Sequence, residues 1–200
     1  MKDHEFTIIA SGLNPQDDAF EDRFFEAGCD DATLSFQKGV IILEFHRQAK
    51  SFAKAVASAY EDVLRAGATV ERIEPDHLVS LSEIAERSGL TRQAISLYTR
   101  AERGQHFPGP VAKVTSKHPL WDWPEVAEWL FEKGTLKRED VVQARIVKEA
   151  NLQLEASDAG AGNFVRRLEA VEGRGYAAHS IYPISGAGAS GPSSPRKRLP

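Results

Sequence analysis

The sequence predicts an α+β protein in which a β-rich unit precedes a helical unit and further helices. Three observations predict this class. Strand-like alternation and helical periodicity follow one another along residues 1–76. Two short amphipathic segments flank Gly89 within a second unit, residues 78–133. Apolar residues then recur at helical spacing in a third segment, residues 137–172.

A strand and a helix open the first unit. Residues 5–10 form a short β-rich run and predict the first strand. Asn14 followed by Pro15 is typical of a helix N-cap with proline at the first helical position, so we expect a helix from there to Gly28. The apolar face of this helix consists of Phe20, Phe24 and Ala27.

A hairpin, a second helix and a last strand complete the first unit. Residues 32–36 and 40–46 predict two strands joined by a tight turn at Gly39. Residues 51–66 carry apolar side chains on one helical face, and residues 69–74 predict a final strand. The resulting order, β-α-β-β-α-β, is that of the ferredoxin-like fold.

Residues 80–100 have the pattern of a helix-turn-helix. Ser80 and Glu83 form a capping box that opens the first helix. Gly89 stands where this helix must end and the chain must turn sharply, which favours a residue that adopts positive φ. Five residues at helical spacing predict a small shared core: Ile84, Ala85, Leu90, Ile95 and Tyr98. The second helix then directs polar residues outward, where they suit the phosphates and base edges of a major groove.

The segment after this motif contains Phe107-Pro-Gly-Pro, a polar stretch, and a helix with two tryptophans. The apolar residues of that helix recur at helical spacing: Trp123, Val126, Trp129 and Leu130. This order resembles the wing and closing helix of MerR-superfamily DNA-binding domains, especially the short excisionase and AlpA-type regulators. The resemblance covers about residues 78–133 and implies a winged helix-turn-helix with a β-hairpin wing after the recognition helix.

The start of the closing helix also has a physical signature of its own. Asp122 and Glu125 form a capping-box-like pair around Pro124, a residue that is tolerated in the first turn of a helix. For Trp123 and Trp129 we expect packing against the helix-turn-helix core rather than stacking on bases.

Eight residues are candidates for DNA contacts. On the second helix of the motif, the polar residues that face outward are Thr91, Arg92, Gln93, Ser96 and Arg100. The family resemblance implies DNA contacts for the last four of these and adds three residues of the wing: Lys113, Ser116 and Lys117.

Charge is divided unevenly along the chain. Residues 1–79 contain 8 basic and 15 acidic side chains, which gives this part a balance of −7. From Arg87 to Lys117 the only acidic residue is Glu102, and six residues are basic: Arg87, Arg92, Arg100, Arg103, Lys113 and Lys117. A polyanion therefore finds a local cationic face although the whole chain has a net charge of −4.

Several classes of protein are disfavoured. No apolar run approaches the 18 or so residues of a membrane span, and the N-terminus lacks the apolar core of a signal peptide, so we expect a cytoplasmic protein with no membrane partner. The single cysteine, Cys29, excludes an internal disulfide and a cysteine-cluster metal site. No phosphate-cradling glycine loop and no nucleophile–base pair is recognisable, so we expect neither a cofactor nor an enzyme.

The sequence pattern of the C-terminal part indicates its structure less specifically. The stripe in residues 138–155 is thin, and it suits either packing inside the chain or a short coiled coil with a second copy. Residues 163–171 predict a further short helix. Residues 183–200 are poor in core-forming residues, so we expect a disordered tail, with Arg196, Lys197 and Arg198 near its end.

Two functions follow from these patterns. The first is a sequence-specific regulator that binds double-stranded DNA, as a homodimer because one recognition helix reads only a few base pairs. The second is a protein-interaction adaptor, such as an antitoxin-like partner protein, without enzymatic activity. For the first unit we expect a role in pairing subunits or in binding a protein partner.

Overall fold

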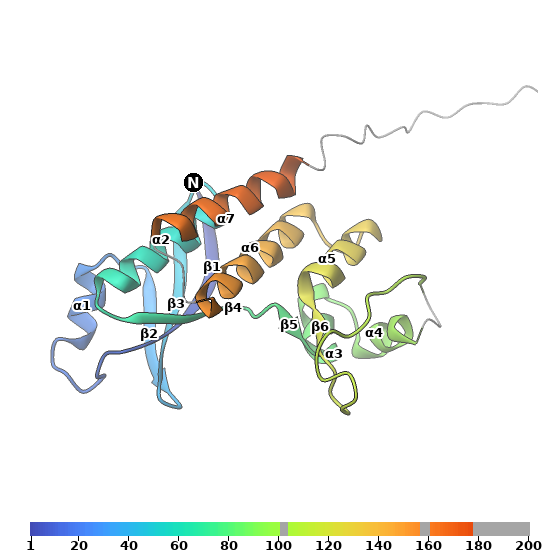
Figure 1. The fold of residues 1–200 in the computed structure, drawn as a ribbon, viewed down its shortest axis with the longest axis horizontal. Coiled ribbons are helices and arrows are strands. Elements are labelled where there is room, and N and C mark those ends of the chain that lie inside the picture. Colours follow the sequence, from blue (N-terminus) through green and yellow to red (C-terminus); the bar gives the residue numbers. More distant parts are fainter. Residues whose placement is uncertain (101–103, 157–160, 178–200) are drawn as a thin grey trace, which may run out of the picture.

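The computed structural model describes residues 1–100, 104–156 and 161–177. Within these residues the chain is an α+β protein with seven helices, a four-stranded antiparallel sheet and a small two-stranded sheet. Figure 1 shows two units side by side, with two long helices above them. Among the described helices, none has both the length and the apolar character needed to cross a membrane.

The first unit is organised by its four-stranded sheet. The strands are β1 (Lys2–Ser11), β2 (Ala32–Gln37), β3 (Val40–Ala49) and β4 (Thr69–Glu74), and they lie in the order β2-β3-β1-β4. Every neighbouring pair is antiparallel. Ile8 of β1 lies opposite both Leu43 of β3 and Ile73 of β4, and all three are fully buried. Alternate residues of the sheet thus face one apolar core, which we call the first core.

Two helices of the first unit cover that face of the sheet. They are α1 (Phe20–Glu26) and α2 (Phe52–Arg65). The Ser51 side chain caps α2 by accepting a hydrogen bond from the Lys54 amide at 3.4 Å, which satisfies one of the unpaired N–H groups of the first turn. The expected segment 51–66 is therefore helical, with Ser51 as the residue just before the helix.

The expected start of the first helix at Asn14 and Pro15 is wrong. The Asn14 side chain accepts a hydrogen bond from the Gln16 amide at 3.1 Å, and the Asn14 carbonyl accepts one from the Asp17 amide at 3.1 Å. Asparagine makes such local turns as readily as it caps helices, because its side chain mimics a backbone acceptor. The chain turns here, and α1 begins only at Phe20.

The C-terminal helices complete the first core. They are α6 (Arg138–Glu155) and α7 (Ala161–Ala177), so the second helix is longer than the expected 163–171. Phe164 of α7 stacks on Tyr60 of α2, with ring centroids 4.0 Å apart. Asn151 of α6 is buried against β4: its amide donates to the Ile73 carbonyl at 2.9 Å, and its oxygen accepts from the Ile73 amide at 2.8 Å. The expected tail, residues 183–200, lies outside the described residues.

The second unit is smaller and has its own core. Its elements are β5 (Leu78–Val79), α3 (Leu81–Ser88), α4 (Arg92–Thr99), β6 (Trp121–Asp122) and α5 (Trp123–Glu132). β5 and β6 pair antiparallel. The apolar side chains of these elements form a second core, in which Ile84, Ile95, Val126 and Leu130 are completely buried.

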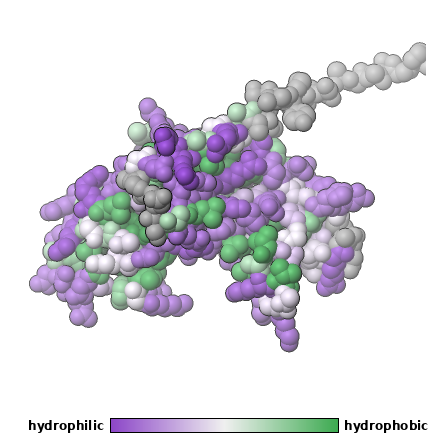
Figure 2. Space-filling model, viewed as in Figure 1, coloured by the Kyte–Doolittle hydropathy of each residue, from purple (hydrophilic) through white to green (hydrophobic). Residues whose placement is uncertain are grey.

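Helix α6 belongs to both cores. Val141 and Ala144 pack into the second core, whereas four other buried residues of the helix pack into the first: Val142, Ile146, Val147 and Ala150. A helix that is apolar on so much of its circumference is stable only when it is covered on several sides. The expected stripe therefore packs inside the chain, and α6 fixes the two units against each other. Figure 2 shows them as separate lobes below this connection.

A buried arginine holds one end of the first core. The Arg47 side chain is 8% exposed and donates to both carboxylate oxygens of Asp31 at 2.8 Å each. It also donates to Asp62 of α2 at 2.6 Å and to the Gly28 carbonyl at 2.7 Å. One guanidinium thus ties β3 to α2 and to the turn after α1.

We expect Arg47→Met to lower the free energy of unfolding by about 3 kcal/mol, because Asp31 loses its counter-charge and the largely buried Asp62 keeps only its ion pair with Arg65 at 2.8 Å. Urea unfolding followed by circular dichroism measures the change. Arg23→Met on the exposed face of α1 is the matched control and should change the free energy of unfolding by less than about 0.5 kcal/mol. Equal losses in the two variants would contradict this account.

Candidate nucleic-acid interface

The turn between α3 and α4 forms as the sequence predicts. Ser80 and Glu83 make both bonds of the capping box: the Ser80 hydroxyl accepts from the Glu83 amide at 3.3 Å, and Glu83 accepts from the Ser80 amide at 2.7 Å. Gly89 ends α3 with φ 67° and ψ 13°, in the left-handed region that glycine adopts without a steric penalty. The Leu90 amide then donates to the Ala85 carbonyl at 3.1 Å and closes the turn.

Thr91 begins the second helix of the motif. Its hydroxyl accepts a hydrogen bond from the Ala94 amide at 3.1 Å, so Thr91 is the N-cap of α4. Its first role is therefore to position the helix, although its side chain is exposed. Arg92 and Gln93, in the first turn of α4, are exposed.

The remaining candidates on α4 divide by exposure. Arg92, Gln93 and Arg100 are exposed, whereas Ser96 is half-buried. Ile95 lies between them in sequence and is completely buried in the second core. The structure thus brings two guanidinium groups and one amide to the surface of a short helix whose other face is anchored.

The predicted wing is a short hairpin-like loop. Ala112 and Leu120 form an isolated antiparallel bridge, in which the Leu120 amide donates to the Ala112 carbonyl at 2.9 Å. Lys113, Ser116 and Lys117 lie in the loop between them, and all three are exposed. The Ser116 hydroxyl accepts from the His118 amide at 3.0 Å, so it helps to shape the loop. Figure 1 shows α4 and this loop on the side of the molecule away from the four-stranded sheet.

Two apolar residues of the wing were not among the expected site residues. Val111 is 52% exposed and Val114 is 59% exposed. Single exposed apolar residues are common on protein surfaces, so the sequence offers no reason to single them out. Val114 lies between the two lysines in sequence, and Val111 lies just before the wing, so exposed apolar side chains accompany the cations here.

A cluster of aromatic rings supports both α4 and the wing. Tyr98, Phe107 and Trp129 lie with their ring centroids 4.9 to 6.0 Å apart. The Trp129 indole also donates to the Gln105 carbonyl at 3.1 Å, which anchors the loop before the wing. Gly104 has φ 72°, and a Cβ on it would come within 2.9 Å of the Trp129 ring. The expected role of Trp129 in core packing is confirmed.

The expected capping box at the start of α5 does not form. Asp122 is the N-cap residue of α5, but its side chain makes no cap hydrogen bond. Its carboxylate instead accepts from the Lys148 ammonium of α6 at 2.7 Å, and Glu125 is exposed. The pattern predicted a local bond, and a long-range ion pair with α6 replaces it.

One residue of the expected cationic face is turned away from the surface. Arg87 donates to the Asp76 carbonyl at 2.6 Å, and its guanidinium lies 5.4 Å from the Trp123 ring centroid. Burial lowers the pKa of Arg87. Arg103 lies outside the described residues. The exposed cations of the face are therefore Arg92, Arg100, Lys113 and Lys117.

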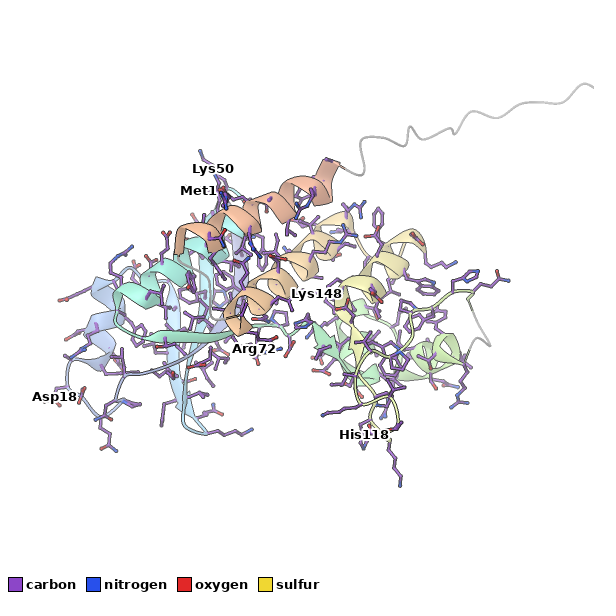
Figure 3. The ribbon with its side chains drawn as sticks, viewed as in Figure 1. Met1, Asp18, Lys50, Arg72, His118 and Lys148 are labelled. Atoms are coloured by element: carbon purple, nitrogen blue, oxygen red, sulfur yellow. The ribbon has the colours of Figure 1, made fainter. Side chains whose placement is uncertain are left out.

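The linker between the two units is fixed by Asp76. Its carboxylate accepts from Arg72 at 2.7 and 2.9 Å and from the Leu78 amide at 3.0 Å. Burial opposes ionisation, but hydrogen bonds from His77, Arg72 and Leu78 hold the pKa of Asp76 well below its usual range. Figure 3 shows Arg72 and Lys148 in the middle of the molecule, where the units meet.

Groups with other chemistry do not gather near this face. Among the described residues, no three His, Cys, Asp or Glu side chains lie close enough together to hold a metal ion. Cys29 is buried in the first core, and burial followed by the nearby Asp62 raises its pKa to about 12. It is therefore a core residue and a poor nucleophile.

No protein-family model, no curated protein and no solved structure matches the chain. The features of this chain that indicate a function are therefore the geometry and charge of the face formed by α4 and the wing.

We expect Asp76→Asn to destabilise the protein by about 1–3 kcal/mol at pH 7, because hydrogen bonds to a charged group are lost. The folded-state pKa lies below the unfolded one, so the stabilisation is present above about pH 4 and fades as the pH falls below that value. The difference from the parent should therefore narrow between pH 5 and about pH 2 in urea unfolding. Asp18→Asn, at an exposed position, is the control; a gap that is constant with pH would contradict the role given to Asp76.

Proposed function

We propose that this chain is a sequence-specific DNA-binding protein, a transcriptional regulator or excisionase-like factor that acts through a winged helix-turn-helix. In this proposal α4 is the recognition helix, the loop between Ala112 and Leu120 is the wing, and the first unit is a ferredoxin-like module. The order of elements and strands in the first unit, β-α-β-β-α-β and β2-β3-β1-β4, supports the last assignment.

One observation carries the proposal. The eight-residue helix α4 follows the turn at Gly89, buries Ile95, and exposes Arg92 and Gln93 in its first turn and Arg100 at its C-cap. From Arg87 to Trp121 the sequence contains a single acidic residue, Glu102. An anchored helix with guanidinium and amide side chains in a region so poor in carboxylates suits a duplex better than it suits most protein surfaces.

The side chains divide between two kinds of contact. Arginine pairs with the O6 and N7 atoms of guanine, and glutamine pairs with N6 and N7 of adenine, so Arg92 and Gln93 are suited to read bases. Lys113 and Lys117 on the wing are point charges that suit phosphates, which position a protein on DNA without specifying sequence. Specificity therefore belongs to α4, and the wing supplies affinity.

The negative charge of the first unit favours DNA contact through the second unit. Its balance of −7 repels a duplex. Figure 3 shows Asp18 at the far end of the molecule from His118 of the wing. DNA would touch the second unit alone. Two copies would be needed for a long recognition site, since one such helix covers only a few base pairs.

A second candidate function is that of a protein-interaction adaptor, and the exposed Val111 and Val114 favour it. Apolar side chains on a projecting loop are typical of surfaces that bind a protein partner. The two candidates differ in their dependence on salt. Phosphate contacts weaken steeply as the salt concentration rises, whereas burial of valine side chains does not.

We expect Arg92→Ala combined with Arg100→Ala to abolish specific DNA binding in gel-shift titrations at several salt concentrations. The slope of log K against log salt should also fall by about 1 for each of the two side chains that contacts a phosphate. The control is Arg166→Ala combined with Arg167→Ala, which removes two exposed charges from α7. Parent-like DNA binding by the α4 variant would exclude α4 as the recognition helix and leave the adaptor as the better account.

We expect Gln93→Ala to relax the preference at one base pair of the binding site and to leave the others intact, because a bidentate amide–adenine pair contributes about 1–3 kcal/mol of discrimination. Selection from a random oligonucleotide library measures the preference at each position. Lys117→Ala is the control, and it should weaken all sites alike because phosphate contacts carry no sequence information. A uniform loss in the Gln93 variant would show that this side chain does not read a base.

A further inference from the structure

The two edges of the four-stranded sheet are protected to very different degrees. At the β4 edge, Asn151 of α6 bonds both backbone groups of Ile73, and the strand itself carries Glu71, Arg72 and Glu74. Charged side chains and covering elements are the usual means by which an edge strand avoids pairing with another chain. The β4 edge is therefore closed.

The β2 edge has none of these features. Its sequence, Ala-Thr-Leu-Ser-Phe-Gln, contains no charge, no proline and no glycine. Among the described strands its one neighbour is β3. Apolar side chains accompany it: Phe36 is 50% exposed, Phe25 on the adjacent α1 is 67% exposed, and Leu34 is half-buried. An uncharged edge strand with exposed phenylalanines is suited to pairing with a further strand.

The backbone of β2 also offers its hydrogen-bonding groups outward in a defined pattern. The Asp31 carbonyl accepts from the His46 amide of β3 at 3.0 Å. Backbone groups alternate along a strand, so the odd-numbered residues of β2 bond to β3 and the even-numbered ones direct N–H and C=O away from it. The Ala32 amide already donates to the Cys29 carbonyl at 3.1 Å, so the outward amides are those of Leu34 and Phe36. The side chains of these even-numbered residues, Ala32, Leu34 and Phe36, face the same side as the first core.

We propose that the β2 edge pairs with the β2 edge of a second copy of this chain, antiparallel and about a twofold axis at Leu34. Leu34 then lies opposite Leu34 of the second copy, and Ala32 lies opposite Phe36. The Leu34 and Phe36 amides donate across the axis, and the two sheets become one continuous eight-stranded sheet. The interface is the same patch on both copies, as a twofold axis requires.

Charge selects both the partner and the register. Asp30 and Lys38 lie in the turns that flank β2, and with Leu34 on the axis Asp30 of each copy lies near Lys38 of the other, so the segment 30–38 is complementary to itself at both ends. A shift of two residues in either direction loses both of these pairs. In the same register Phe36 lies over a hollow of the second copy that is lined by Phe25, Ala32 and Leu34 and also by the carboxylates Glu21, Asp22 and Asp30. An unrelated strand would match neither feature.

This pairing does not depend on the proposed function. Figure 1 shows β2 and α4 at opposite sides of the molecule, so the second copy leaves α4 and the wing uncovered. A variant that cannot pair should therefore keep its affinity for a single DNA site, and a chain that does not bind DNA would still form the pair.

Sedimentation equilibrium of the full chain at 0.15 M salt tests the pairing. The parent should be a dimer, and Phe36→Asp should raise the dimer dissociation constant roughly tenfold or more, because it places a negative charge in the interface beside Glu21, Asp22 and Asp30 of the second copy. Thr33→Asp adds the same charge to the opposite face of β2 and is the matched control. A monomeric parent at every concentration, or equal dissociation constants for the two variants, would overturn the proposal.

Cysteine cross-linking and a charge swap test the register. Under mild oxidation Leu34→Cys should form a disulfide-linked dimer, whereas Ser35→Cys should not, because its two copies lie beyond about 7 Å between Cα atoms in this register. The buried Cys29 gives no background. Asp30→Lys should weaken the dimer, and Asp30→Lys with Lys38→Asp should restore it. Cross-linking by Ser35→Cys alone, or no rescue by the double variant, would overturn the assigned register.

Discussion

Helix α6 is the element on which the rest of the structure depends. It contributes Val141 and Ala144 to the second core and Ile146, Val147 and Ala150 to the first, so neither core is complete without it. Each unit buries only part of its apolar surface alone, and small domains are marginal for that reason. By supplying side chains to both, α6 makes the stability of each unit depend on contact with the other.

The same helix determines how the candidate interface is held. Glu128 of α5 accepts from Arg138 and Arg145 of α6 at 2.6 to 3.0 Å, and Asp122 at the start of α5 accepts from Lys148. Helix α5 in turn carries Trp129, which packs against Tyr98 of α4. A chain of direct contacts therefore runs from the first core to α4. An interface supported in this way is preorganised, and it does not have to be ordered when it binds.

The sequence predicted best those elements whose signals are local. Ser80, Glu83 and Gly89 lie within ten residues of one another and interact only with neighbours, so the helix-turn-helix corner forms as expected. The errors arise where a polar residue has two competing partners: Asn14 closes a turn instead of capping a helix, and Asp122 bonds a lysine 26 residues away. Helix α6 looked weakly amphipathic in the sequence because its apolar residues are divided between two buried faces. A pattern that assumes one apolar face underestimates how much of such a helix is buried.

Arg87 shows why counting charges along a sequence overestimates the number of cations that a binding face exposes. Its guanidinium is held by the Asp76 carbonyl and the Trp123 ring, so it stabilises the junction rather than the field outside it. Helix α6 fixes the position of the acidic first unit, so that unit does not approach the remaining exposed cations. Charges are screened beyond about 8 Å at physiological salt, so the acidic surface near Asp18 acts weakly on a polyanion at the wing. The same acidic surface strongly repels a polyanion that approaches the sheet. Because the two units are rigidly attached, a chain with a net charge of −4 therefore favours polyanion binding at the second unit.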